Sequence, residues 1–551
     1  MDIRIQTLEK HSEELFTKRG SLMALWQEAA ENFYVERADF TSTRNIGRDF
    51  AANLTTSYPI MARRSLQDSF STMLRPLGTE WFKVTTARPD KIDNEGKQWL
   101  EWATGLQRRA MYDKVAMFER ASKEGDGDFA TFGQCVKSAE INLYREKPSL
   151  LYRCWHLRDV AWNETFDGRK LPVYRKWEPT AIDLNKIFKG NVSATVKKAV
   201  DKDPYRKIKV KHCIHSAEDY ESPAGKKWKA PYVSVYFECE GGHILEETDT
   251  YNKFYVIPRW QTVSGSQYAY SPATIAALPD ARLIQSMTLT LLEAGEKAVN
   301  PPLVATQEVV RGDMQIYAGG VTWIDSEYDE RLGEALRPLN IDTRGIPLGM
   351  EMRNDVREMI SQAFYLNKIS MPPAQGKEMT AYEVGQRIEE YIRNALPLFG
   401  PVEKEDNAEM CDLTFELLQR NSAFGDPRDI PQSLRGQDIE FQFESPLHQA
   451  IERKKGQSFQ EAKALLAEAA ALDPAAVHMV DTRVALRETL EGIGVPQKWI
   501  RDEKAMEAID IEAKQQQQSQ MLMQMMQQGG EAATAIGEGG QAINAMAQGA
   551  V

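Results

Sequence analysis

The chain has 551 residues, of which 42% are hydrophobic and 27% are charged. These proportions are near the averages for globular proteins and exclude a collagen, a wholly disordered chain and a disulfide miniprotein. At about 100–200 residues per domain, the length predicts three or four structural units. Lys and Arg total 68 against 80 Asp and Glu, a formal net charge of −12. Because affinity for duplex DNA comes largely from neutralised phosphates, we expect any contact with nucleic acid to be local or weak.

The cysteines and the N-terminus indicate where the protein is made. The five cysteines are odd in number and widely spaced, which favours free thiols in a reducing compartment. The first 20 residues carry charges every few positions and have no apolar core, so we expect no signal peptide. No stretch approaches about 18 apolar residues without a charge. We therefore expect no membrane partner and synthesis in the cytoplasm.

Helical periodicity dominates the first 123 residues, where apolar side chains recur at spacings of three, four and seven. We expect helices over residues 3–37, 57–75 and 95–123. The turn Pro76-Leu77-Gly78 ends the second helix, and a short strand follows at 81–84. Gly125, Gly127 and Gly133 are expected to break the helical pattern.

From about 134 to 262 the period of the pattern changes to two, which is typical of strands. Apolar and polar residues alternate around 205–215 and 232–239, which predicts half-buried antiparallel strands. A charged helical piece at about 180–200 interrupts this region. The predicted fold class is mainly α with a β-rich middle module, an α+β arrangement.

The second half of the chain returns to helix. Residues 272–299 predict one helix about 42 Å long, with Leu283, Met287 and Leu291 on its apolar face. We expect further helices over 349–369 and 380–421, a strand over 438–443 and a last helical region reaching about 514. Thr380 and Glu383 form a capping box at the start of the 380–421 helix, which Pro397 and Pro401 should kink or break. Residues 515–551 are of low complexity, with a Gln/Met part that is helical in an assembly and a disordered end.

The sequence contains no recognisable catalytic motif. The phosphate-binding pattern G-x-x-x-x-G-K-[ST] is absent, as are G-x-S-x-G, H-E-x-x-H and a strand-borne G-x-G-x-x-G. The run 124–128 resembles part of a calcium loop but lacks a third ligand and the terminal Glu, so we expect a solvated turn there. We therefore predict no catalytic residues, no cofactor and no enzymatic activity.

One cluster has the character of a metal site. It consists of His212, Cys213, His215, Cys239 and His243, on two strands that can pair. No C-x-x-C pair is present, and Cys213 and His215 lie on the opposite strand face from His212. We therefore predict no metal site, and zinc remains the alternative.

The residues alone indicate a multi-domain, non-enzymatic part of an assembly with unusually long helices. Short basic clusters such as Lys197-Lys198 favour solvated surface over a nucleic-acid site.

Five short motifs then occur in the order seen in one family. They are Met73 to Phe82 (MLRPLGTEWF), Tyr268 to Pro272 with Ala277 to Asp280 and Pro301 to Leu303, Met379 to Val384 (MTAYEV), Phe443 to Leu447, and Gly494 to Pro496 with Trp499-Ile500. In this set and order the chain resembles the head-to-tail connector, or portal, proteins of short-tailed, podovirus-type bacteriophages. Tyr270 departs from the Arg or Lys that is common there.

The resemblance implies a ring of about twelve subunits at a capsid vertex, through which double-stranded DNA is packaged and ejected. It also implies contacts with the terminase large subunit, tail adaptor and tail tube proteins, and major capsid and scaffold proteins. The protein would be in the virion, and in the host cytoplasm during assembly. Arg282 and Lys297 are the DNA-facing candidates, with salt bridges between subunits as the alternative for both.

The resemblance also implies a division of the chain into wing, stem, clip and crown. The expected parts are a wing at 1–150, a β-rich region with part of the wing and the clip at 151–271, a stem helix at 272–299, a channel-loop region at 300–350, returning wing helices at 351–455, a crown at 456–514 and a Gln/Met-rich barrel or tail at 515–551. Two other interpretations remain open: a capsid-associated coiled-coil scaffold, and a nucleic-acid enzyme whose motifs have diverged.

Overall fold

The computed structural model describes most of the chain and divides it into two compact units. The described residues are 3–42, 52, 54–142, 148–220, 227–299, 301, 303–305, 336–338, 344–369, 398–444, 462–467, 480–492, 495–501 and 506–521. The first unit comprises 1–82, 105–424 and 441–450, and the second comprises 83–104, 425–440 and 451–551. The mixture of helix and sheet that the sequence predicts is confirmed.

The N-terminal region forms two helices where one was expected. Helix α1 (Ile3–Lys18) and helix α2 (Gly20–Phe33) meet at Arg19, and a short 3-10 turn (Val35–Arg37) follows. The Arg19 side chain is buried and donates to the carbonyls of Leu157, Arg158 and Val160. The expectation of one helix over 3–37 is therefore wrong, because a long-range contact of Arg19 fixes the break.

Helix α3 (Tyr58–Leu74) and strand β1 (Phe82–Thr86) lie where the sequence predicts them. The helix expected over 95–123 is instead two helices, α4 (Asn94–Met111) and α5 (Phe118–Phe132), separated at Met117, which has a φ of 59°. Gly125 and Gly127 lie inside α5 and do not break it. A Cβ atom at Gly127 would lie 3.0 Å from the Tyr34 ring, so a small residue permits close packing there.

The run 124–128 is therefore not a solvated turn. Asp126 and Asp128 are 2% and 1% exposed within α5, and each pairs with an arginine, Arg75 and Arg37 respectively.

Gly133 ends α5 in the left-handed conformation, with a φ of 74°. A Cβ atom there would lie 2.1 Å from the backbone carbon of Tyr270 and 2.3 Å from the nitrogen of Ser271. We expect Gly133→Ala to lower the free energy of unfolding by about 3 kcal/mol or more, because both the φ strain and the backbone clash oppose the substitution. Gly78→Ala is the matched control: Gly78 has a φ of 81° with no atom within 4 Å of an added Cβ, so about 1 kcal/mol is expected. If the two variants lowered the melting temperature by the same amount, the backbone clash at Gly133 would not contribute to the loss of stability.

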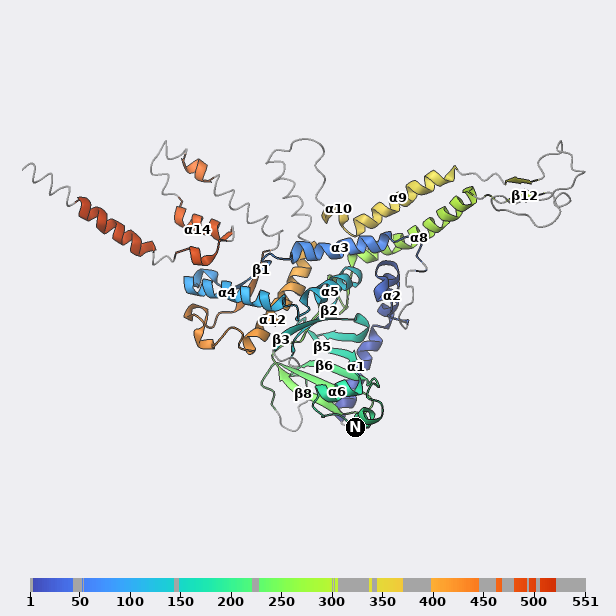
Figure 1. Cartoon of the computed structure of the whole chain (residues 1–551), viewed down its shortest axis with the longest axis horizontal. Helices are drawn as coiled ribbons and strands as arrows, with labels where there is room; N and C mark the ends of the chain where they lie inside the picture. The colour runs from blue at the N-terminus through green and yellow to red at the C-terminus, as the bar shows by residue number, and fades with distance from the viewer. Residues whose placement is uncertain are drawn as a thin grey trace, which may run out of the picture. The chain divides into compact units, whose positions relative to one another are not determined.

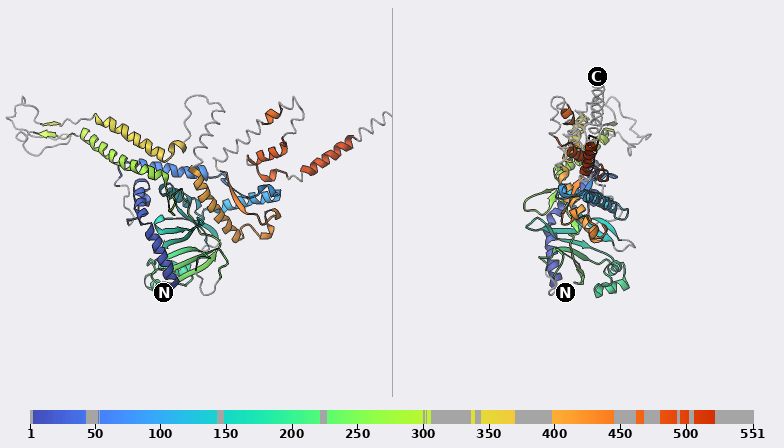
Figure 2. Two further views of the ribbon diagram at one scale, coloured as in Figure 1. Left: turned by 180° about the vertical axis from the view of Figure 1, so that it is seen from behind. Right: turned by 90° about the vertical axis from the view of Figure 1, so that its left-hand side faces the viewer.

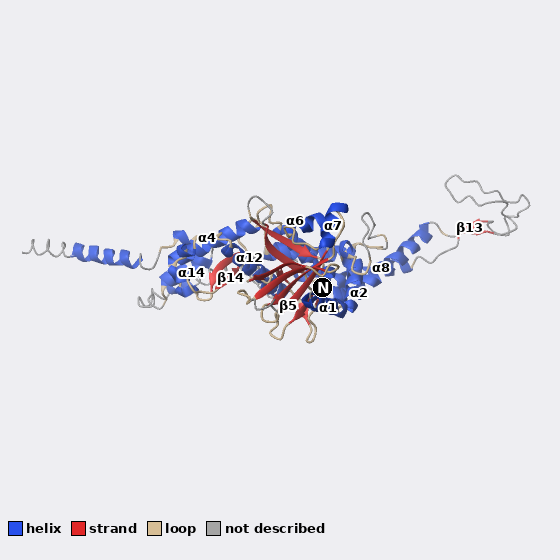
Figure 3. Ribbon diagram, turned by 90° about the horizontal axis from the view of Figure 1, so that it is seen from below, coloured by secondary structure: helices blue, strands red, loops and turns tan. Residues whose placement is uncertain are grey.

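The β-rich middle contains a five-stranded antiparallel sheet in the order β4-β5-β6-β7-β8. Its strands are β4 (Val160–Glu164), β5 (Lys170–Trp177), β6 (Val210–Ser216), β7 (Tyr232–Glu238) and β8 (Ile244–Thr250). The two predicted strands, β6 and β7, are confirmed, but β6 is buried along its whole length. Helix α1 covers one face of the sheet, and helices α6 (Ala181–Ile187) and α7 (Ala194–Lys202) lie on the other (Figure 3).

Smaller strand pairs complete the β structure. Strands β3 (Ser149–Trp155), β2 (Val136–Asn142) and β9 (Tyr255–Val256) form one sheet, and β10 (Gln261–Thr262) pairs with β11 (Ala269–Tyr270). Strand β12 (Leu303–Ala305) pairs with β13 (Leu336–Pro338), and β1 pairs with β14 (Ile439–Phe443), which confirms the late predicted strand.

Helix α8 (Pro272–Val299) has the predicted bounds. Helix α9 (Gly345–Ala363) ends before Tyr365, which has a φ of 59°, and α10 (Leu366–Ile369) follows. Pro401 does not break its helix. A π-helical turn (Glu403–Ala408) follows it and leads into α12 (Glu409–Arg420).

Some expectations for the C-terminal half lie outside the described residues, including Thr380, Glu383, Pro397 and residues 522–551. In the second unit, α14 (Thr482–Gly492) and a 3-10 turn (Gln497–Trp499) lie in the helical region that was expected to reach about 514. Helical residues 506–521 continue past that expected end into the Gln/Met part. No helix among the residues described has the length and apolar character needed to span a membrane.

Candidate functional site

Helices α8 and α9 form a pair that extends from the first unit (Figures 1 and 2). They run side by side, and strand β12, which follows α8, lies at the far end of the pair. The two helices are antiparallel. Gly349, near the start of α9, lies against Leu291 in the distal half of α8, whereas Ile360, near the end of α9, shares a core with the first half of α8.

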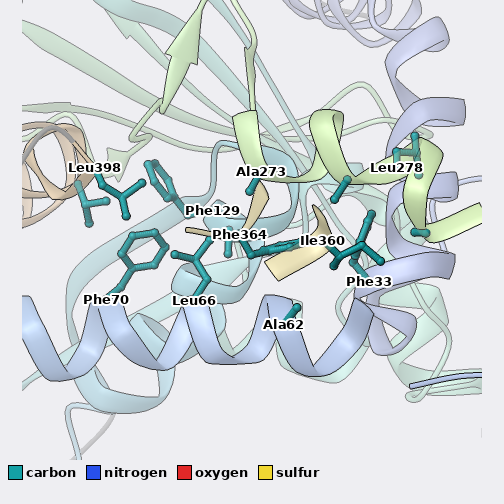
Figure 4. Packing of buried hydrophobic residues seen from close by; sticks show 14 of the residues in the cluster. Phe33, Ala62, Leu66, Phe70, Phe129, Ala273, Leu278, Ile360, Phe364 and Leu398 are labelled. Carbon is teal, nitrogen blue, oxygen red and sulfur yellow. The ribbon is translucent and has the colours of Figure 1, made fainter. Parts of the chain in front are cut away.

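The base of this pair is anchored in a hydrophobic core (Figure 4). Leu66 and Phe70 of α3 and Phe129 of α5 point into the core, where they meet residues of α8 and α9. The α8 and α9 members are Ala273, Ala277, Leu278, Ala281, Ile284, Val356, Ile360 and the following Phe364. Because these side chains are buried, the root of the pair is fixed to α3 and α5.

Gln285, which follows the buried Ile284 on α8, adds a set of hydrogen bonds. Its side-chain oxygen accepts from the backbone nitrogens of Thr55 (2.7 Å) and Thr56 (3.0 Å), and its amide nitrogen donates to the Thr56 carbonyl (3.0 Å). The Thr55 hydroxyl lies 2.7 Å from the Gln285 carbonyl oxygen. These bonds hold the segment before α3 against the middle of α8.

The buried face of α8 is not the one that the sequence predicts. Leu283 is 47% exposed, and Met287 and Leu291 are half-buried, whereas Ala277, Ala281 and Ile284 are fully buried. Within one chain, Leu283 therefore does not belong to the buried face of α8, although the sequence places it on the apolar one. The apolar pattern favoured the large side chains, but the core uses small residues that allow α3 and α9 to approach closely.

The pair carries several exposed large apolar residues. They are Leu283, Leu289 and Leu292 on α8 and Leu348, Met352 and Met359 on α9, each 44–61% exposed. At about 100° per residue, Leu289 lies beyond one edge of the buried face of α8 and Leu283 beyond the other, whereas Leu292 continues the line of the buried Ala281 past the core. We call Leu283, Leu289 and Leu292 the apolar flanks of α8.

Between these flanks, opposite the core, lies a stripe of exposed polar residues. At the same helical spacing it consists of Arg282, Ser286, Thr290, Glu293 and Lys297. Both predicted DNA-facing residues therefore belong to one stripe. Arg282 pairs with Glu28 of α2, with Nε 2.6 Å from Oε1, whereas Lys297 is exposed in the last turn of α8.

A second group of charges, buried in the first unit, gave no signal in the sequence. Arg75 Nη1 lies 3.1 Å from Asp406 Oδ2 and 2.7 Å from Asn407 Oδ1, and the same guanidinium pairs with Asp126. Lys137 Nζ pairs with Asp406. These four charged side chains are 6% exposed or less and form a neutral ionic cluster. No local pattern marks residues that are up to 331 positions apart.

The two buried histidines of the suspected metal cluster have other partners. His212 Nδ1 lies 2.5 Å from Tyr255 Oη, and its Nε2 lies 2.9 Å from Ser234 Oγ. His215 Nε2 lies 2.8 Å from Tyr174 Oη on the opposite face of the sheet. Within the described ranges, no group of three or more His, Cys, Asp and Glu residues could hold a metal ion.

These histidines predict acid sensitivity. Burial and the neighbouring His11 lower the pKa of His215 to about 3, and burial also lowers the pKa of His212. The unfolded state therefore binds more protons, and stability falls as the pH drops from about 6.5 towards 3, by roughly 1.4 kcal/mol per pH unit and histidine. In denaturation series over this pH range, we expect His215→Gln to remove the contribution of one proton from the slope. An unchanged slope in His215→Gln would contradict the argument.

Two residues of the short motifs that carry the family resemblance, Trp81 and Ser271, make structural contacts. Trp81 is 1% exposed, and its indole nitrogen donates to Tyr112 Oη at 2.9 Å. Ser271 is buried at the start of α8, where its hydroxyl donates to the Ala130 carbonyl at 2.7 Å and accepts from the Thr274 nitrogen at 3.3 Å. These contacts join α8 to the end of α5, beside Gly133.

Known proteins resemble this chain along most of its length. The family described as "Bacteriophage head to tail connecting protein" matches residues 5–500. The portal protein of Salmonella phage epsilon15 is 24% identical over 549 residues, which cover 97% of this chain and 95% of that protein. Two solved chains, from a native gene transfer agent virion and from the neck of an empty particle, each have a TM-score of 0.36. Their identities are 10% and 11%, over 75% and 76% of this chain and 86% and 90% of theirs.

The family match spans the helix pair, its core and the sheet, and the family resemblance drawn from short motifs is confirmed. The chain belongs to the family of bacteriophage proteins that connect the head to the tail.

Proposed function

We propose that this connector is a portal: twelve copies form a ring at one capsid vertex, and double-stranded DNA passes through the axial channel during packaging and ejection. The protein has no catalytic role in this proposal and needs no cofactor. The support is the family match together with the portal protein of phage epsilon15, which is similar along nearly the whole chain.

The observation that carries the proposal is the outward surface of α8. A cyclic ring needs two different surfaces on each subunit, one for each neighbour. The apolar flanks supply them: Leu283 would meet one neighbour, and Leu289 and Leu292 the other. The polar stripe between the flanks would then face the channel.

The antiparallel packing of α8 and α9 supports a stem made of both helices. We therefore place α9, most of which falls in the expected wing return at 351–455, beside α8 in the proposed stem. In the same proposal the chain that connects the two helices, expected from the sequence to be a channel-loop region at 300–350, takes the clip position, and part of 151–271 does not. The wing at 1–150, the crown at 456–514 and the barrel at 515–551 remain proposals.

A portal must let DNA slide. Twelve copies have a summed formal charge of −144, so the channel as a whole would not hold the polyanion tightly. Lys297 is the stronger DNA-facing candidate of the two, because Glu28 already pairs with Arg282. A single ring of twelve Lys297 side chains would contact phosphates weakly and reversibly.

The same proposal includes transient docking of the terminase large subunit, followed by tail adaptor and tail tube proteins. Contacts with the major capsid and scaffold proteins would fix the ring in the virion, after assembly in the host cytoplasm.

Mass measurement of the purified protein tests the proposal. We expect a closed species near twelve subunits, with a channel wide enough for duplex DNA in images of the particle. Monomers at micromolar concentration, or open fibres, would overturn the ring and favour the coiled-coil scaffold. Hydrolysis of ATP or cleavage of DNA by the purified protein would favour the enzyme.

A further inference from the structure

The insert between β5 and β6, residues 180–209, differs in charge from the rest of the chain. It contains eight Lys and Arg and three Asp and Glu, a formal charge of +5, whereas the other 521 residues together carry −17. It lies at the end of the sheet that is remote from α8 and α9 (Figure 1). The positive charge of the insert is therefore separate from the polar stripe of α8.

The insert is a folded element with a fixed orientation. Leu184, Phe188 and Val196 pack with Val210 and Leu245 of the sheet. The hydroxyls of Thr180 and Ser193 cap α6 and α7 by accepting from the backbone nitrogens of Asp183 and Val196, each at 3.3 Å. Because its apolar side is committed to the sheet, the basic side is held outward.

The insert carries seven exposed lysines. They are Lys186, Lys189, Lys197, Lys198, Lys202, Lys207 and Lys209. Across the described part of the chain, none of them has an ion-pair partner. Arg206 differs, since it lies 3.6 Å from Glu240. Tyr205 is 77% exposed among these lysines and presents a hydroxyl donor.

We propose that this basic insert binds the phosphate backbone of duplex DNA outside the axial channel. Lysine heads act as point charges without forked geometry, so binding would be independent of sequence. The identity of the anion as genomic duplex rests on the proposed function, whereas the anion-binding face rests on the insert alone.

The composition of the face favours DNA over an acidic protein. The cores of protein–protein interfaces are depleted in Lys and Asp and enriched in aromatic residues and Met. Protein–DNA interfaces are much more positively charged. Here the exposed large side chains are Tyr205 and the 43% exposed Ile182, with lysines around them.

Binding of a fluorescent 30-base-pair duplex to the full-length protein, followed by anisotropy over a salt series, tests the proposal. The variant replaces four lysines of the insert (Lys197, Lys198, Lys202 and Lys207) by Gln. We expect its affinity at 100 mM salt to fall by roughly tenfold or more, and the slope of log K against log salt to become shallower by about 2 to 4. The same four positions changed to Arg should retain binding.

The matched control removes four exposed lysines outside the insert (Lys10, Lys18, Lys114 and Lys123), so the net charge changes equally. Wild-type affinity in the insert variant, or an equal loss in the control, would overturn the proposal. Competition by polyglutamate as effective as that by duplex at equal charge would favour an acidic protein partner and also overturn it. Particle mass, measured on the same samples, separates this outcome from failure of the ring, because DNA binding by the insert does not require ring closure.

Discussion

Asp406→Ala is expected to lower the free energy of unfolding by about 3–5 kcal/mol. Asp406 is 2% exposed and neutralises two buried cations, Arg75 and Lys137. Without its carboxylate, both cations would share Asp126 as their one buried anion in this cluster. Chemical denaturation followed by tryptophan fluorescence measures the change.

The size of this effect follows from burial. An exposed ion pair contributes about 0–1 kcal/mol, because water screens each charge when its partner is removed. Inside the ionic cluster, water cannot screen a charge whose partner has been removed, so the unpaired charge keeps its full desolvation penalty. The cluster also joins the end of α3, helix α5, strand β2 and the π-helical turn, so its loss would loosen the core that anchors α8 and α9.

Two further variants make the prediction specific. Glu124→Ala removes an exposed pair with Arg120 on α5 (3.1 Å) and should cost under about 0.5 kcal/mol. Lys137→Met combined with Asp406→Leu removes one cation and one anion together and leaves the Arg75–Asp126 pair balanced. This double variant should be more stable than Asp406→Ala alone. If the single and double variants unfold at the same denaturant concentration, charge balance is not what stabilises the cluster.

The sequence predicted the positions of elements better than their interruptions. Helices α3 and α8 and strands β6, β7 and β14 lie where local periodicity placed them. The breaks at Arg19 and Met117 were not predicted, because each depends on contacts or backbone geometry that no local pattern encodes. Arg19 illustrates this: its side chain reaches carbonyls nearly 140 positions away.

The candidate site was predicted in part for the same reason. The bounds of α8 and the place of Arg282 and Lys297 on it could be inferred from the sequence. The buried face of α8 could not be inferred, because it depends on which side packs against α3 and α9. That side contains Ala277 and Ala281, whose small side chains contribute little to a hydrophobic pattern in the sequence. The ionic cluster and the role of Gln285 are set entirely by tertiary contacts.

The apolar flanks of α8 predict the largest effect on assembly. Leu289→Glu combined with Leu292→Glu should abolish rings, because two carboxylates per subunit would be buried without partners at every contact around the ring. The single chain should remain folded, since both leucines are about half exposed in it. Particle mass and melting temperature, measured together, separate the loss of assembly from unfolding.

The control variant changes two residues on a different face of the same helix. Ser286→Glu combined with Thr290→Glu adds the same two charges to the polar stripe, where both side chains are exposed. If the stripe faces the channel, rings should form with normal mass, since carboxylates there would stay in water. Rings that survive the changes at Leu289 and Leu292 but are lost with those at Ser286 and Thr290 would reverse the assignment. The stripe would then be the contact between subunits, and Lys297 would lie at that contact rather than along the path of the DNA.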